Sequence, residues 1–214
     1  MKCLFPFLFL VCVCVSACMG QQIDTNTQNN KNMTEKLDFD FLEKEAKKRQ
    51  DASGNISYFL GWRTMEDGTM LKIGGNTGSR FLKQERPPLP AYWILFTMYD
   101  GKGIIKEKGK RLEMDQKIGI WQYFDENGNL IREEDHDKQY EGVFSCEQIL
   151  SFLRERGHLG ENNAGIEKVV FYYNPNEKYW SLGVHLPGGG KRHGYKLDAI
   201  TGEILFDKLE FLKE

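Results

Sequence analysis

The amino-acid sequence predicts an α+β protein: an antiparallel β meander followed by a helix and a three-stranded antiparallel sheet. Three observations predict this order. Between about 55 and 140, short runs rich in β-branched and aromatic residues alternate with tight-turn residue pairs. A capping box at Ser145 and Gln148 then precedes apolar residues at helical spacing. Apolar and polar residues alternate again in the segments that follow, as they do in strands with one buried face.

The first 17 residues have the pattern of a secretory signal. Lys2 precedes the uncharged run Cys3–Val15, whose 13 residues fall short of the roughly 20 that a membrane-spanning helix needs. The string Val15-Ser16-Ala17-Cys18 resembles the lipobox of bacterial lipoproteins, in which the cysteine sulfur receives a diacylglycerol. The resemblance implies cleavage before Cys18 and a lipid anchor on that residue. Val15 and Ala17 also satisfy ordinary signal cleavage, which would release a soluble secreted protein.

Charge and cysteine content limit the classes of function that we expect. The formal net charge of −2 becomes −3 once the signal and its Lys2 are removed, so nothing in the composition attracts nucleic acid. Three of the five cysteines leave with the signal and Cys18 carries the lipid, which leaves Cys146 alone. We therefore expect no intramolecular disulfide and a fold that depends on its hydrophobic core.

The region after the signal divides into a tether and a first folded part. Residues 18–36 are rich in Asn, Gln and Thr, and we interpret them as a flexible tether. Residues 37–142 form the first part, which opens with a short helix over 38–50. Its acidic residues come first and its basic residues last, as the helix dipole favours, and Phe39, Leu42 and Ala46 fall on one stripe.

The meander is predicted from its turns and from an internal repeat. The turn pairs are Asp67-Gly68, Asp100-Gly101 and Asn127-Gly128, and the stretches 99–107 and 124–133 look like copies of one hairpin unit. The Pro-rich string at 86–90 is interpreted as a link between strands, with a polyproline ligand as the alternative.

Residues 91–135 also resemble the MORN-like repeats of bacterial envelope and antitoxin or immunity proteins. The likeness lies in Gly119, Trp121 and Tyr123, which open a strand, and in the turn string at 125–129. The resemblance implies a binding scaffold and no reaction.

Residues 143–214 are predicted to form a second part with a helix from Ser145 to a stop at Gly157. Three strands follow, at 167–173, 180–186 and 194–206. The string from Tyr195 through Thr201-Gly202 is similar to the last hairpin of PepSY-type modules, and the likeness covers residues 144–207. PepSY modules occur in peptidase propeptides and envelope proteins, so the resemblance implies an inhibitory or binding role.

Trp121, Tyr123 and Trp180 are the candidate binding aromatics. They could form an exposed recognition patch, but large rings in a small sheet protein more often form its core, and both interpretations stay open here. Cys146 could be a nucleophile because the first turn of a helix lowers a thiol pKa, yet a buried apolar role accounts for it better.

The remaining polar motifs predict no site. Asp125, Asn127 and Asn129 imitate the start of a calcium loop, but Leu130 stands where Gly is needed and His136 where Glu is needed. The Gly-rich string at 188–194 has no Ser or Thr after its lysine, so we expect a hairpin loop there and no phosphate cradle. The four histidines lack catalytic or zinc-like spacing, and we predict no metal, no cofactor and no catalytic residues.

These observations favour a non-enzymatic lipoprotein of the bacterial cell envelope. It would be held on a membrane by its lipid, face the periplasm or the exterior, and bind another protein. An immunity protein against a toxin is the sharpest version of this hypothesis. A PepSY-like modulator or inhibitor of an envelope peptidase is the alternative, and an enzyme ranks third.

Overall fold

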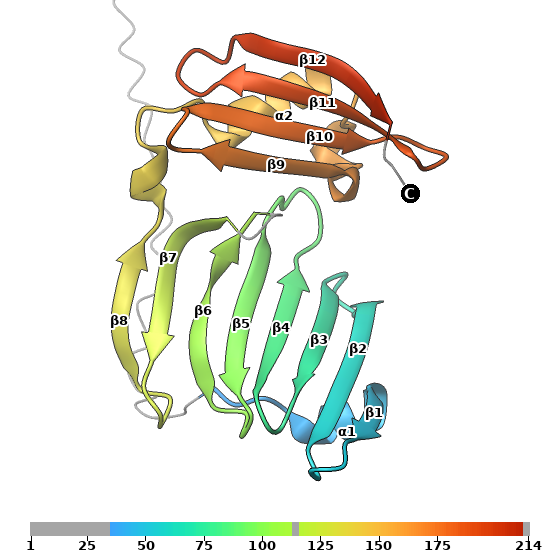
Figure 1. The fold of residues 1–214 in the computed structure, drawn as a ribbon, viewed down its shortest axis with the longest axis vertical. Coiled ribbons are helices and arrows are strands. Elements are labelled where there is room, and N and C mark those ends of the chain that lie inside the picture. The colour runs from blue at the N-terminus through green and yellow to red at the C-terminus, as the bar shows by residue number, and fades with distance from the viewer. Residues whose placement is uncertain (1–34, 113–115, 212–214) are drawn as a thin grey trace, which may run out of the picture. The chain divides into compact units, whose positions relative to one another are not determined.

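The computed structural model describes residues 35–112 and 116–211. The signal at 1–17, the lipidation residue Cys18 and the tether up to residue 34 lie outside this part of the chain. The described residues form a large sheet, a small sheet and short helices, so the predicted α+β class is confirmed (Figure 1).

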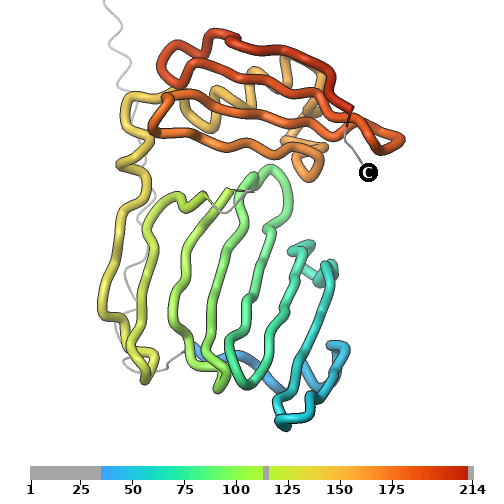
Figure 2. Tube along the Cα trace, in the orientation of Figure 1, coloured from blue at the N-terminus to red at the C-terminus, as the bar shows by residue number. Residues whose placement is uncertain are grey.

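The large sheet is an antiparallel meander of eight strands in sequence order. Each strand returns beside the one before it through a short connection, except for the longer link between β4 and β5 that holds the Pro-rich string (Figure 2). The strands are β1 (Lys47–Gln50), β2 (Ile56–Thr64), β3 (Met70–Asn76), β4 (Arg80–Arg86), β5 (Ile94–Asp100), β6 (Ile105–Arg111), β7 (Lys117–Phe124) and β8 (Leu130–Asp135).

The first helix is shorter than predicted. Helix α1 spans Phe39–Glu45 and is capped by Asp38, whose carboxylate accepts a hydrogen bond of 2.8 Å from the Phe41 N–H. Ala46 is already extended, and Lys47–Gln50 pairs with β2 as strand β1. The helix prediction to residue 50 is therefore wrong at its end, because pairing with β2 gives these backbone groups an alternative set of partners.

A short N-terminal arm (residues 35–38) belongs to the folded body. Lys36 forms an isolated antiparallel bridge with Ile104, and the Leu37 N–H donates to the Gly103 carbonyl over 2.9 Å. Glu35 and Lys36, the last two residues assigned to the tether, thus belong to the folded body. The arm and α1 cover an apolar cluster on one face of the sheet, which contains Leu37, Leu42, Tyr58, Leu60, Leu71, Ile73, Phe81, Tyr99 and Ile105.

The second part contains helix α2 and the small sheet. Helix α2 spans Cys146–Glu155, and its predicted capping box is confirmed by reciprocal hydrogen bonds between Ser145 and Gln148. The small sheet has the order β12-β11-β10-β9, and its strands are β9 (Val169–Asn174), β10 (Tyr179–His185), β11 (Lys191–Asp198) and β12 (Ile204–Phe211). Apolar residues of α2 pack against one face of this sheet, namely Ile149, Leu150 and Leu153.

The small sheet has four strands where three were predicted. The segment 194–206, expected as the third strand around its turn, belongs to a hairpin of β11 and β12. Gly202 has φ +74° in the turn, a conformation that glycine adopts without strain, and it lets the chain reverse after Asp198.

Candidate functional site

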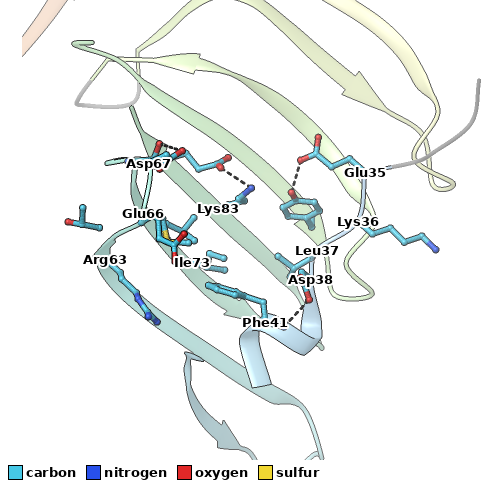
Figure 3. Close-up of a pocket in the computed structure, with 16 residues that line it drawn as sticks. Glu35, Lys36, Leu37, Asp38, Phe41, Arg63, Glu66, Asp67, Ile73 and Lys83 are labelled. Atoms are coloured by element: carbon cyan, nitrogen blue, oxygen red, sulfur yellow. Dashed lines mark hydrogen bonds and ion pairs between the residues drawn. The ribbon is translucent and has the colours of Figure 1, made fainter. Parts of the chain in front are cut away.

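The candidate site is a cleft between the N-terminal arm, α1 and the face of the large sheet (Figure 3). Its volume is about 720 Å³. The arm residues Glu35 and Leu37 and the helix residue Phe41 lie on one side, and Arg63 and Glu66 lie on the other. The cleft therefore joins chain segments that are far apart in the sequence.

The floor of the cleft is apolar. Leu71 and Ile73 are alternate residues of β3, so both project from the same face of the sheet, and both are buried. Leu37, Phe41 and Met65 complete the apolar lining. An apolar side chain from another molecule would lose its contact with water here, which is the main source of affinity in a binding pocket.

Charged side chains surround this floor, and acidic ones are in excess. The carboxylates are Glu35, Asp38, Glu66, Asp67 and Glu85, whereas the cations are Lys36, Arg63 and Lys83. Five acidic groups against three basic ones leave two formal negative charges in excess. A partner that brings basic side chains to the cleft would be favoured over an acidic one.

Glu35 fixes the arm to the sheet through two hydrogen bonds. Its carboxylate accepts one from Lys108 Nζ over 2.6 Å and another from the Tyr99 hydroxyl over 2.9 Å. Burial alone would raise the pKa of Glu35, but the hydrogen bond and positive charge of Lys108, together with Tyr99, hold this pKa below its ordinary value. Burial, and then the Glu35 charge, raises the pKa of Tyr99, which keeps its hydroxyl protonated as a donor.

The Glu35→Gln variant is expected to lose about 0.5–1 kcal/mol of unfolding free energy at pH 7, a magnitude reduced by solvent screening. A carboxylate whose folded pKa is depressed stabilises the protein above its unfolded pKa, and this stabilisation is lost as the pH falls through the folded pKa. The variant should therefore lose less stability than the wild type on acidification. Urea unfolding at pH 7 and at lower pH measures both effects. Glu66→Gln, an exposed carboxylate across the cleft, is the control, and an equal effect of the two changes would contradict this role of Glu35.

The candidate binding aromatics are largely interior. Trp121 is 2% exposed and Trp180 is fully buried, so neither ring offers a surface to a partner. The Trp121 Nε1–H donates to the Lys110 carbonyl over 2.8 Å, and the Trp180 ring stacks on Tyr140 with centroids 5.9 Å apart. The interpretation of these two tryptophans as a recognition patch is corrected: burial of their large apolar surface stabilises the core.

Tyr123 is half-buried on β7 and engaged by basic side chains of the same sheet. Its hydroxyl accepts a hydrogen bond from Lys117 Nζ over 3.1 Å, and the Arg132 guanidinium lies 4.1 Å from its ring centroid. Its exposed edge is part of the sheet surface and does not line the cleft.

Cys146 lies at the start of α2, as expected, but its thiol is not activated. Burial raises the pKa of Cys146 to about 12, and the nearby charge of Glu147 adds to this rise. A thiol with such a pKa is protonated at neutral pH and is a poor nucleophile. Desolvation thus outweighs the effect of the helix start on this residue.

Asp125 stabilises a hairpin turn. Its Oδ1 accepts hydrogen bonds of 2.8 Å from the backbone N–H groups of both Asn127 and Asn129. Gly128 has φ +81° in the same turn. Within residues 35–112 and 116–211, no group of three or more His, Cys, Asp or Glu side chains is placed to hold a metal ion.

A polar cluster between the loop after α2 and the small sheet was missed by sequence reasoning. His158 Nε2 and the Tyr195 hydroxyl share a hydrogen bond of 2.6 Å, and His193 Nε2 and Asp207 share another of 2.6 Å. The two imidazole rings lie 5.4 Å apart, and burial, followed by the neighbouring His193, lowers the pKa of His158. The alternation of residues 193 and 195 on one strand was a usable signal, but the register that brings Asp207 opposite Tyr195 could not be read from spacing.

Comparison with protein-family models, with curated proteins and with solved structures finds no match to this chain. The MORN-like and PepSY-like resemblances therefore rest on their sequence motifs alone. Among the described residues, no helix has the length and apolar character that crossing a membrane requires.

Proposed function

We propose that this protein is a lipid-anchored protein of the bacterial cell envelope that binds another protein without catalysing a reaction. In its sharpest form, it is an immunity protein that binds and neutralises a toxin. Cys18 carries the anchor in this proposal, and the body faces the periplasm or the exterior. The lipobox string and the MORN-like motif support the location and the binding role.

The cleft is the observation that carries the proposed binding role. An apolar floor surrounded by charged groups is the composition of protein-recognition surfaces, where an apolar anchor is buried and polar groups around it provide specificity. The floor residues Leu71 and Ile73 belong to the rigid sheet, whereas the arm supplies Glu35 and Leu37. The acidic excess favours a partner segment in which basic residues flank an apolar one.

The test is capture of a partner by the purified full chain, followed by measurement of its affinity for variants of the cleft. The double variant Met65→Lys and Glu66→Lys adds positive charge to the apolar lining and to the acidic surround, and we expect it to weaken binding at least tenfold. Glu126→Lys is the control for the charge reversal at Glu66, because it makes the same Glu-to-Lys change on the exposed turn between β7 and β8. Isothermal titration calorimetry measures the dissociation constants, and circular dichroism checks that the variants fold.

The toxicity of the captured partner tests the immunity role. The captured protein is expected to harm bacteria that lack this chain and to be harmless to bacteria that produce it. Equal affinity of the wild type and the cleft double variant would contradict the binding surface. A native chain without an acyl group on Cys18 would contradict the anchor.

A further inference from the structure

Strand β12 is unusually apolar for the outermost strand of a sheet. Phe211 is 72% exposed and Leu205 is 56% exposed, and three more large apolar side chains of the same strand are also exposed, namely Ile204, Phe206 and Leu209. Edge strands are usually protected by charged residues, and β1 follows that rule with the sequence Lys-Lys-Arg-Gln. β12 instead combines five exposed apolar side chains with its three charged residues, Asp207, Lys208 and Glu210.

The apolar residues of β12 occur on both faces of the sheet. Phe206 lies opposite Lys196 of β11, and Leu209 lies opposite His193. Positions 206 and 209 differ in parity, so their side chains project to opposite faces. A neighbouring strand would bring its own side chains beside those of β12 on both faces, so cross-strand pairs would bury part of this apolar surface on each face.

The outer edge of β12 has no strand beside it in the described ranges. β11 pairs with β12 from Lys191↔Phe211 to Leu197↔Ile204, and β12 ends the strand order of the small sheet. The backbone groups that point outward are therefore available to another strand. Pairing along this edge would satisfy them and place the apolar side chains near the end of β12, Leu209 and Phe211, beside another strand.

We propose that β12 pairs in antiparallel orientation with β12 of a second copy of this chain. A two-fold axis perpendicular to the sheet relates the two copies, so the two four-stranded sheets join into one continuous sheet. Each face of one copy continues into the same face of the other. Both copies use the same surface in this contact, so the assembly is complete with two copies. It therefore gives a dimer and no filament.

The charge pattern of β12 selects the register of this pair. With the axis at Leu209, that residue faces itself, and Lys208 of each copy faces Glu210 of the partner subunit. Axes at Asp207, Lys208 or Glu210 would place like charges directly opposite, which destabilises antiparallel pairs. An axis at Phe206 brings no opposite charges together. The register at Leu209 is therefore favoured by charge complementarity on both sides of the axis.

Glu210 is already held in place by its own chain. Arg192 of β11 donates to the Glu210 carboxylate through Nη2 over 2.6 Å and through Nε over 2.7 Å. A carboxylate fixed by two hydrogen bonds loses little further conformational freedom when Lys208 of the partner subunit approaches.

Sedimentation equilibrium of the purified full chain in mild detergent tests the proposal. We expect the wild type to be a dimer and the Leu209→Lys variant to be a monomer. Ile131→Lys is the matched control, since Ile131 is 65% exposed on β8, the edge strand of the other sheet, and this variant should remain a dimer. A monomeric wild type, or a Leu209→Lys variant that dimerises as the wild type does, would overturn the proposal.

A charge exchange tests the register and controls for folding. Lys208→Glu alone and Glu210→Lys alone place like charges opposite at both sides of the axis, and each should weaken dimerisation at least tenfold. An equimolar mixture of the two variants restores opposite charges at both positions, so it should form the mixed dimer. Recovery in the mixture also shows that both variants are folded. A mixture as weak as either variant alone would exclude this register and, with it, the pairing we propose.

Discussion

The Trp180→Ala variant is expected to lose about 3–5 kcal/mol of unfolding free energy, as large aromatic truncations in cores do. Trp180 is fully buried, and its ring lies 5.2 Å from the Tyr173 ring and 5.9 Å from the stacked Tyr140 ring. Its removal leaves a cavity that these neighbouring rings cannot fill without leaving their own contacts. Denaturant unfolding followed by circular dichroism measures the loss.

Trp62→Ala is the control for this prediction, because it makes the same chemical change at an exposed ring. Trp62 is 38% exposed on β2, and its contacts include the cations of Lys72 and Arg86. Loss of such contacts costs about 1 kcal/mol. If both variants lost the same stability, the interior position of Trp180 would be contradicted.

The Gly109→Ala variant is expected to lose about 1–3 kcal/mol, the cost of inserting a methyl group into a packed core. A Cβ at Gly109 would lie 2.4–2.5 Å from three atoms of the Trp121 ring. That ring cannot move freely, since its Nε1–H donates a hydrogen bond to the Lys110 carbonyl and the Phe96 ring packs beside it with centroids 5.8 Å apart. The added carbon must therefore displace the tryptophan or distort β6.

Gly61→Ala is the matched control for Gly109→Ala. Gly61 also lies within a strand, but a Cβ there would meet only Phe59 Cε1, at the ordinary contact distance of 3.9 Å. We expect a change within about 0.5 kcal/mol. Thermal unfolding of the two variants side by side decides the matter, and an unaltered Gly109→Ala protein would contradict the close approach of Trp121.

Elements with local determinants were predictable from the sequence. Helix α2 has its own capping residues, Ser145 and Gln148, and a glycine with φ +72° at position 157 just after its end. Leu42 falls on the predicted apolar stripe of α1 and is fully buried. The meander was predictable because its hairpins depend on short turns, although the positive φ in the turn after Asp100 belongs to Gly103 and not to Gly101.

Elements that depend on distant partners were not predictable. Strands β3 and β4 carry glycines and charged residues at positions where a strand pattern would have apolar ones. Their composition therefore gives a weak strand signal, and they form strands because β3 pairs with β2 and β4 pairs with β5. β1 resembles the end of a helix in composition and becomes a strand only because β2 lies beside it.

The candidate site was even less predictable from the sequence than these strands. The cleft needs the arm to dock on the sheet, and no spacing rule links Glu35 to Lys108 or Tyr99. The cluster of His158 and His193 likewise depends on the return of the chain after α2. Sequence reasoning left a binding role and a core role open for the large aromatic residues, and the structure places Trp121 and Trp180 in the core.

The docking of the arm has a kinetic consequence. Strands of the large sheet pair only with their neighbours along the chain, so most loops that must close are short and their entropic cost is low. The contact between Glu35 and Lys108 instead spans 73 positions. We therefore expect the hairpins to form first and the arm to join last, so the cleft is completed only after the sheet that supports it has folded.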